Sequence, residues 1–294
     1  MNAPASVRHL APPEVPARFR HLLRSEWIKL RSLRSTPYVL GPGGLVVTGI
    51  CVNAARSNAD RLDRGPRPGP GPDPGAAADA DSGLPAFAFD ALGTAFVDPA
   101  WQLLMVLAAC LGAAALSGEY ATGLARTTFA AVPDRRSVVA AKAVVVTAVL
   151  LVFGACVALT SFAATQALLR DHGGLSLSDP GAARAVVASA LLAPVCGLVG
   201  MAAGALVRHA AGAAVTVIGV LLLLPALFQG DTYRWVRETG HLLPLDAWAT
   251  LVHDPALPVT EKYPATAAEA WTVLGAWGVL GLAVAMAAVH HRDV

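Results

Sequence analysis

Long apolar stretches dominate the sequence between residues 98 and 291, and they limit the folds open to the chain. Each has about 20 residues, the length that an α-helix needs to cross the hydrocarbon core of a bilayer. Only 14% of the 294 residues are charged, against about 25% in soluble domains. Backbone groups inside a bilayer must pair within their own segment, so we expect helices, and no alternating pattern of a β-barrel accompanies them.

The positions of these stretches predict an all-α fold, a polytopic transmembrane helical bundle of six spans. Arg208 and His209 interrupt a stretch of double length and predict a tight hairpin between the fourth and fifth spans. Trp101 is expected at the membrane interface, and Lys142 is expected to extend toward the lipid headgroups. The predicted spans are residues 37–55, 99–117, 139–168, 185–207, 210–228 and 270–289.

The segments before and between the spans differ in composition. Residues 1–16, rich in Pro and Ala, predict a disordered tail, and residues 37–294 form the predicted membrane domain. Gly and Pro alternate within the polar loop at about 56–97, which predicts disorder outside the membrane.

An amphipathic helix is predicted within residues 17–36. At 100° per residue its apolar side chains share one face, which predicts a helix lying in the membrane surface with its cations toward anionic headgroups. Glu26 interrupts this face, and Lys29 is within reach at i+3. Two interpretations remain open for Glu26: an ordinary surface ion pair, or a contact with another protein. The apolar face consists of Phe19, Leu22, Leu23, Trp27, Leu30 and Leu33.

The distribution of charge predicts the orientation of the spans. Six spans place both termini on one side, which also receives thirteen of the 22 Lys and Arg residues but only five of the 20 acids. Basic residues accumulate on the cytoplasmic side, so both termini are predicted to lie in the cytoplasm of a cell with the chain in its inner (plasma) membrane. No apolar leader precedes the first span, which is expected to act as its own insertion signal.

Signatures of catalysis are missing from the sequence. It has no His-Glu-x-x-His motif, no Gly-x-Ser-x-Gly elbow and no phosphate-binding Gly-x-x-x-x-Gly-Lys-Ser/Thr loop. We therefore expect no enzymatic activity, no catalytic residue, no cofactor and no metal site. The span interiors hold almost no ionisable residue, which argues against proton- or sodium-coupled transport. Four cysteines are expected to be apolar packing residues: Cys51, Cys110, Cys156 and Cys196.

The connection between the second and third spans is short and dense in charge and turn-forming residues. Glu119 and Arg126 are two turns apart if the segment is helical, so they would share a face, and Pro133 would end that helix. One interpretation is a capped loop whose arginines follow the positive-inside bias. The other is a docking element for a cytoplasmic partner.

Several short motifs resemble one family. Residues 25–32, SEWIKLRS, resemble the N-terminal interfacial helix of type-2 ABC transporter permeases of actinobacteria. Gly118-Glu119-Tyr120, followed by Gly123, Arg126 and the AVP at 131–133, resembles the segment after their second span. The AAK at 140–142 and the six spans extend the resemblance over nearly the whole chain.

The resemblance implies the membrane-spanning permease subunit of an ATP-driven exporter. A second permease copy, identical or different, would complete a dimer in the lipid bilayer, and a separate cytoplasmic ABC ATPase subunit would hydrolyse ATP; no nucleic-acid partner is expected. The docking candidates that the resemblance implies are Glu26, Lys29, Glu119, Gly123 and Arg126. The alternative is a non-transporting membrane scaffold or self-immunity protein with the same topology.

Overall fold

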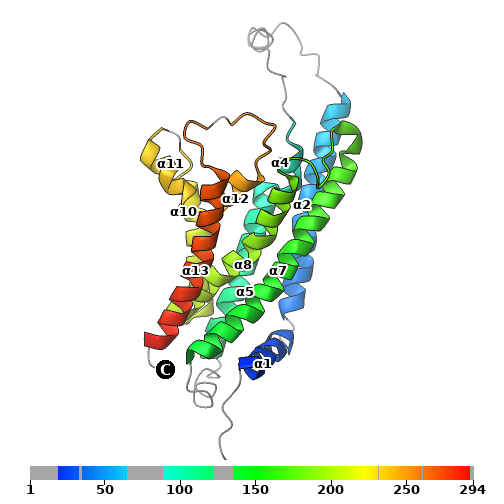
Figure 1. Ribbon diagram of the computed structural model, residues 1–294. Coiled ribbons are helices and arrows are strands. Elements are labelled where there is room, and N and C mark those ends of the chain that lie inside the picture. Colours follow the sequence, from blue (N-terminus) through cyan, green and yellow to red (C-terminus); the bar gives the residue numbers. More distant parts are fainter. Residues whose placement is uncertain are drawn as a thin grey trace, which may run out of the picture.

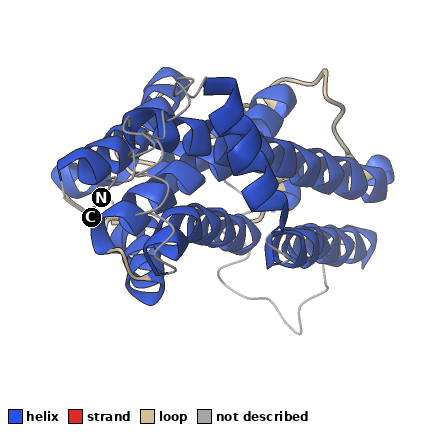
Figure 2. Ribbon diagram, turned by 90° about the horizontal axis from the view of Figure 1, so that it is seen from below, coloured by secondary structure: helices blue, strands red, loops and turns tan. Residues whose placement is uncertain are grey.

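The protein is described by a computed structural model that covers residues 19–32, 35–64, 89–121, 135–230, 232–259 and 261–291. The predicted tail at 1–16, the Gly/Pro-rich part of the first loop, Gly123 and Arg126 lie outside these residues. Regular structure within the described residues is helical, with no strand (Figure 2).

The helices form one bundle (Figure 1). Their bounds are α1 (Phe19–Ser32), α2 (Ser35–Arg64), α4 (Ala91–Ala95), α5 (Asp98–Ala121), α7 (Arg135–Leu168), the 3₁₀ turn η1 (Arg170–His172), α8 (Ala182–Val207), α9 (Ala210–Ile218), the π-helical turn η2 (Gly219–Leu223), α10 (Leu224–Leu227), α11 (Arg234–His241), α12 (Pro244–Val252) and α13 (Ala267–His291).

Six of these helices are long and apolar enough to cross a membrane, which confirms the predicted multi-pass fold. The spans are Thr36–Arg64, Asp98–Ala121, Arg136–Leu168, Ala182–Val207, Ala210–Leu227 and Ala267–His290. The first span departs most from its predicted end at residue 55. Residues 56–64 are mostly polar but contain no Gly or Pro, and α2 continues to Arg64. The next residues in the sequence are Gly65 and Pro66, and proline disfavours the helical conformation of the residue before it.

Helix α8 lies at the centre of the bundle and packs against α5, α7 and α13. Glycines allow this close approach. A Cβ added to Gly200 would overlap the carbonyl oxygen of Ala109, and one added to Gly204 would overlap that of Ala113. Small residues at such interfaces let helix backbones approach closely in a membrane, which increases their dispersion contacts.

The predicted hairpin between the fourth and fifth spans is present. Arg208 ends α8 in the left-handed conformation, with φ of 56°, and its guanidinium lies 4.9 Å from the ring centroid of Tyr120 on α5. His209 caps α9, because its Nδ1 accepts a hydrogen bond of 3.2 Å from the backbone N–H of Gly212. The fifth span then continues through η2 and α10 to Leu227.

The two ends of the bundle are built differently. Helix α1 lies across one end, where α13 also ends (Figure 1). Helices α4, α11 and α12 gather at the opposite end. We refer to these as the α1 end and the α11 end. Helix α1 and the end of α13 lie at the same end, as expected when an even number of spans separates the two ends of the chain.

The environment of Trp101 differs from the sequence prediction. Instead of facing a membrane interface, it is fully buried, with its ring centroid 5.5 Å from that of Phe96 and 5.7 Å from that of Trp248. The connection between the fifth and sixth spans contributes Trp248 through α12, and its indole N–H donates a hydrogen bond of 2.9 Å to Ser189 Oγ on α8. This aromatic cluster therefore closes the α11 end of the core.

Candidate functional site

The position of Glu26 follows from the packing of α1 on the first turns of α7. Leu22 is buried against Val138 and Ala141 of α7. Glu26 comes one helical turn after Leu22, so it lies on the same face and is carried toward α7 with it. Its side chain is only 4% exposed. Glu26 therefore sits within the buried face of α1 rather than interrupting a lipid-facing one.

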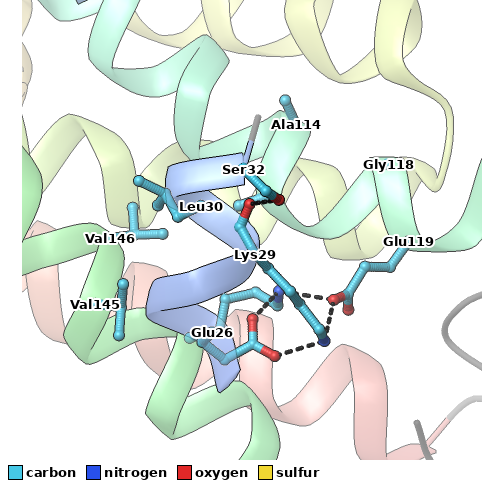
Figure 3. A pocket seen from close by; sticks show the side chains of 11 residues that line it. Glu26, Lys29, Leu30, Ser32, Ala114, Gly118, Glu119, Val145 and Val146 are labelled. Carbon is cyan, nitrogen blue, oxygen red and sulfur yellow. Dashed lines mark hydrogen bonds and ion pairs between the residues drawn. The ribbon is translucent and has the colours of Figure 1, made fainter. Parts of the chain in front are cut away.

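Glu26 belongs to a closed ring of four charged side chains (Figure 3). Lys142 Nζ on α7 lies 2.5 Å from Glu26 Oε2 and 2.9 Å from Glu119 Oε1, at the end of α5. Lys29 Nζ lies 2.7 Å from Glu26 Oε1 and 3.0 Å from Glu119 Oε1. Each ammonium group thus bridges both carboxylates, and these ion pairs join α1, α5 and α7. We call Glu26, Lys29, Glu119 and Lys142 the charged ring.

The charges of the ring balance, two negative and two positive. Side-chain exposure is 4% for Glu26, 7% for Lys142 and 13% for Glu119, but 37% for Lys29. Burial lowers the pKa of Lys29, but hydrogen bonds and charge attraction from Glu26 and Glu119 outweigh it and raise the pKa above its ordinary value. The ring therefore holds Lys29 in its charged form.

The ring also explains how α5 tolerates an acid at its end. Glu119 lies in the last turn of α5, where the negative end of the helix dipole disfavours a carboxylate. The ammonium groups of Lys29 and Lys142 offset this repulsion. The same contacts join the end of α5 to the start of α7, on either side of the connection at residues 122–134.

The structure brings together three of the five predicted docking residues. Glu26, Lys29 and Glu119 meet in the ring, whereas Gly123 and Arg126 lie outside the described residues. The i,i+3 contact between Glu26 and Lys29 is present, but their pair is not an ordinary surface one, because Glu26 is buried. Lys142 was expected to extend toward the headgroups and instead binds both carboxylates.

The outer face of α1 presents a different surface. Trp27 and Ile28 are exposed, and so are the side chains of Arg20 and Arg24. Glu26 is the one acid of α1 and is buried by the ring, so the exposed part of the helix is basic. A basic, partly apolar surface of this kind suits a membrane surface or an acidic partner.

A second polar cluster, at the α11 end, was not anticipated from the sequence. Arg237 on α11 donates a hydrogen bond of 3.0 Å to Asp246 Oδ1 on α12 and forms an ion pair with Glu261. His241 lies with Nδ1 2.6 Å from Asp246 Oδ2 and Nε2 2.8 Å from the carbonyl oxygen of Tyr263. These contacts fasten α11 and the segment before α13 onto α12. In the sequence, the mixture of acids, Arg and His between the fifth and sixth spans is the feature that could have indicated this polar cluster.

The charged ring at the α1 end is an arrangement of ion pairs between helices. Among the residues that the structure describes, no group of three or more His, Cys, Asp or Glu side chains is placed to hold a metal ion. Each ring carboxylate is neutralised by two ammonium groups. The ring is therefore suited to joining α1, α5 and α7 into one unit.

Comparison with known proteins adds no family assignment. No protein-family model matches the chain, and no curated protein matches it.

Proposed function

We propose that the chain is the membrane-spanning permease subunit of an ATP-driven ABC exporter, coupled to a separate ATPase chain. The observation that supports this most strongly is the charged ring, which joins a surface helix to the ends of two spans. A membrane subunit driven from outside the bilayer needs such a joint, because force applied at the surface must reach the spans.

The ring gives the joint its strength. Breaking a buried ion pair by displacing one partner costs about 3–5 kcal/mol, because the other charge stays buried without a partner. Separating α1 from the bundle would break the contacts of Glu26 with Lys142 and of Lys29 with Glu119. A partner that pushes on α1, or on the connection after α5, would therefore move α5 and α7 as well.

The distribution of ionisable residues supports an external source of energy. Within the described spans, acidic and basic side chains lie toward the helix ends, as Asp98, Glu119, Lys142 and Glu269 do. Proton and ion pumps place such groups along the membrane interior. The sequence also has no phosphate-binding loop, so ATP hydrolysis belongs to another chain in this proposal.

The first and fifth spans leave room for a second permease copy. They are the least buried of the six, with exposed apolar residues such as Leu45 on α2 and Val215 on α9. Both pack on α5, whose face bearing Gln102, Val106 and Cys110 is half-buried. A partner seated against these spans would enclose that face of α5 and create a path between the two subunits.

The proposal is tested by co-expressing the chain with candidate ABC ATPase chains from the same source and measuring ATP hydrolysis in lipid nanodiscs. We expect the two chains to purify together, and Arg126→Ala to lower the stimulation of hydrolysis by the permease. Arg170→Ala, at the α11 end, is the matched control and should leave the stimulation unchanged. A stably folded chain that binds no ATPase would contradict the proposal and favour a scaffold or self-immunity protein.

A further inference from the structure

A cavity of about 280 Å³ lies beside the charged ring, between α1, α5 and α7 (Figure 3). The ring residues line one side of it. The other walls are apolar or small: Leu30 on α1, Ala114, Ala115 and Gly118 on α5, and Val145 and Val146 on α7. The cavity thus has one charged edge and an apolar interior.

The sequence leaves this space open through small residues on α5. A Cβ added to Gly118 would meet no other atom within 4 Å, and Ala114 is exposed. Ala115 lies one helical turn before Glu119, and Val146 lies one turn after Lys142. The apolar walls are therefore deeper in the bilayer than the ring, and the ring lies toward the headgroups.

The charged edge of the cavity is electrically asymmetric. The ring as a whole is neutral, but Lys29 is 37% exposed whereas Glu26 and Glu119 are 4% and 13% exposed. A ligand at the cavity mouth therefore meets positive charge first.

We propose that the cavity binds one acyl chain of an anionic phospholipid, with the lipid phosphate against Lys29. The depth of the apolar walls below a charged edge matches the division between headgroup and acyl chain. Sites for whole drug-sized ligands occupy about 300–1,000 Å³, so a volume of about 280 Å³ suits part of a lipid, one chain segment, better than a complete ligand. The partly exposed Lys29 side chain, whose ammonium donates to Glu26 and Glu119 and has a third N–H, complements the phosphate.

A bound lipid would fill the joint between α1 and the spans. It would contact α1 through Leu30, α5 through Ala114 and Gly118, and α7 through Val145. A ligand that binds the folded chain stabilises it in proportion to its occupancy, so thermal unfolding should report binding. The inference does not require an ATPase, and its test uses the permease chain alone.

The experiment titrates the purified full chain in detergent with dioleoylphosphatidylglycerol and with dioleoylphosphatidylcholine. Native mass spectrometry counts bound lipids, and thermal unfolding follows stabilisation. We expect one tightly bound phosphatidylglycerol and a larger rise in the unfolding midpoint than with phosphatidylcholine. Lys29→Gln should weaken phosphatidylglycerol binding about fivefold, since an interfacial cation contributes about that factor toward an anionic lipid.

Gly118→Leu fills the cavity and should abolish the tightly bound lipid. Gly275→Leu on α13 is the matched control, because a Cβ there also meets no atom within 4 Å, and it should retain the lipid. Ala114→Leu, at an exposed position, replaces Gly118→Leu if that variant does not fold. Two results would overturn the inference: unchanged lipid binding in the filled variant, or equal stabilisation by both lipids.

Discussion

At the scale of single residues, the four members of the charged ring contribute unequally to the stability of the chain. Glu26→Gln leaves buried Lys142 with Glu119 as its remaining carboxylate partner, so it costs part of the ~3–5 kcal/mol of a fully unpaired buried charge. Lys29→Gln removes the most exposed member, and exposed ion pairs contribute only about 0–1 kcal/mol. We therefore expect Glu26→Gln to lower the stability of the purified chain several times more than Lys29→Gln, as measured by thermal unfolding in detergent.

Limited proteolysis provides a second readout of this prediction. Loosening of α1 from α7 should expose cleavage sites after Arg20 and Arg24 in Glu26→Gln. A control at Glu238, an exposed acid that pairs with Arg234 at the α11 end, should change neither stability nor cleavage when it is replaced by Gln. Equal effects of Glu26→Gln and Lys29→Gln would contradict the buried ring.

Asp90 is expected to make the thermal stability of the chain depend on pH, and one substitution should remove this dependence. Burial raises the pKa of Asp90, although the backbone N–H of Gly93 donates a hydrogen bond of 2.6 Å to its Oδ1. The pKa of Asp90 is higher in the folded chain than in the unfolded chain, so protonation of Asp90 favours folding. The stabilisation that Asp90 provides is complete below the ordinary Asp pKa and is lost as the pH rises through the pKa of the folded chain. Asn at this position keeps an acceptor for Gly93 but carries no charge.

We therefore expect Asp90→Asn to unfold at a higher temperature than the native chain at neutral pH, and the difference to disappear in acid. Thermal unfolding across a pH series measures this. Asp90→Ala, which also removes the cap of α4, should be less stable than Asp90→Asn at every pH. A pH-independent difference between the native chain and Asp90→Asn would contradict a raised pKa.

Sequence spacing predicted part of the candidate site. Glu26 and Lys29 are three residues apart on one helix, so their contact follows from helical geometry. Lys142 is 116 residues from Glu26, and only the packing of α1 on α7 brings them together. The burial of Trp101 is another tertiary effect, because its aromatic partner Trp248 comes from a distant segment.

At the scale of elements, α8 depends on the absence of side chains at its contact with α5. Gly200→Val would place Cβ against the carbonyl of Ala109, where the helix backbones leave no space. Overpacking of a tight core typically costs about 1–3 kcal/mol, and here backbone atoms must move. Gly275→Val on α13 introduces the same residue at a position with no neighbour within 4 Å.

The expected result is a clear loss of thermal stability and folded yield in Gly200→Val and little change in Gly275→Val. Size-exclusion chromatography in detergent and thermal unfolding measure both. Since each variant adds the same β-branched side chain to a helix, their difference reports packing rather than helix propensity. Two variants of equal stability would mean that α5 and α8 do not approach as closely as described.

The elements differ in how far sequence determines them. Long apolar runs predict spans because the cost of exposing backbone to lipid leaves helices as the stable choice. Helices α11 and α12, between the fifth and sixth spans, were not predicted, because helices of eight and nine residues depend on tertiary contacts such as that between Arg237 and Asp246. The extension of α2 to Arg64 was missed because hydropathy ends before helical structure does.

At the scale of the whole molecule, the six spans and the position of α1 together predict which surfaces lie on the same side of the membrane. Helix α1 and the end of α13 share one end, and the segment after α7 lies at the other (Figure 1). An impermeant maleimide added to sealed vesicles should therefore label Arg24→Cys and Ser178→Cys from opposite sides, both residues being exposed. The bilayer hydrocarbon separates the two positions.

The native cysteines provide the background for this measurement. Cys51 and Cys196 are buried, and Cys156 is exposed in the middle of a span, where lipid rather than water would cover it. None of these three should react with the impermeant reagent, whereas a lipid-soluble maleimide should reach Cys156. Labelling of Arg24→Cys and Ser178→Cys from the same side would require an even number of spans between them, instead of the three described. The six-span topology that predicts a cytoplasmic position for the charged ring would then fail, and the proposed coupling would fail with it.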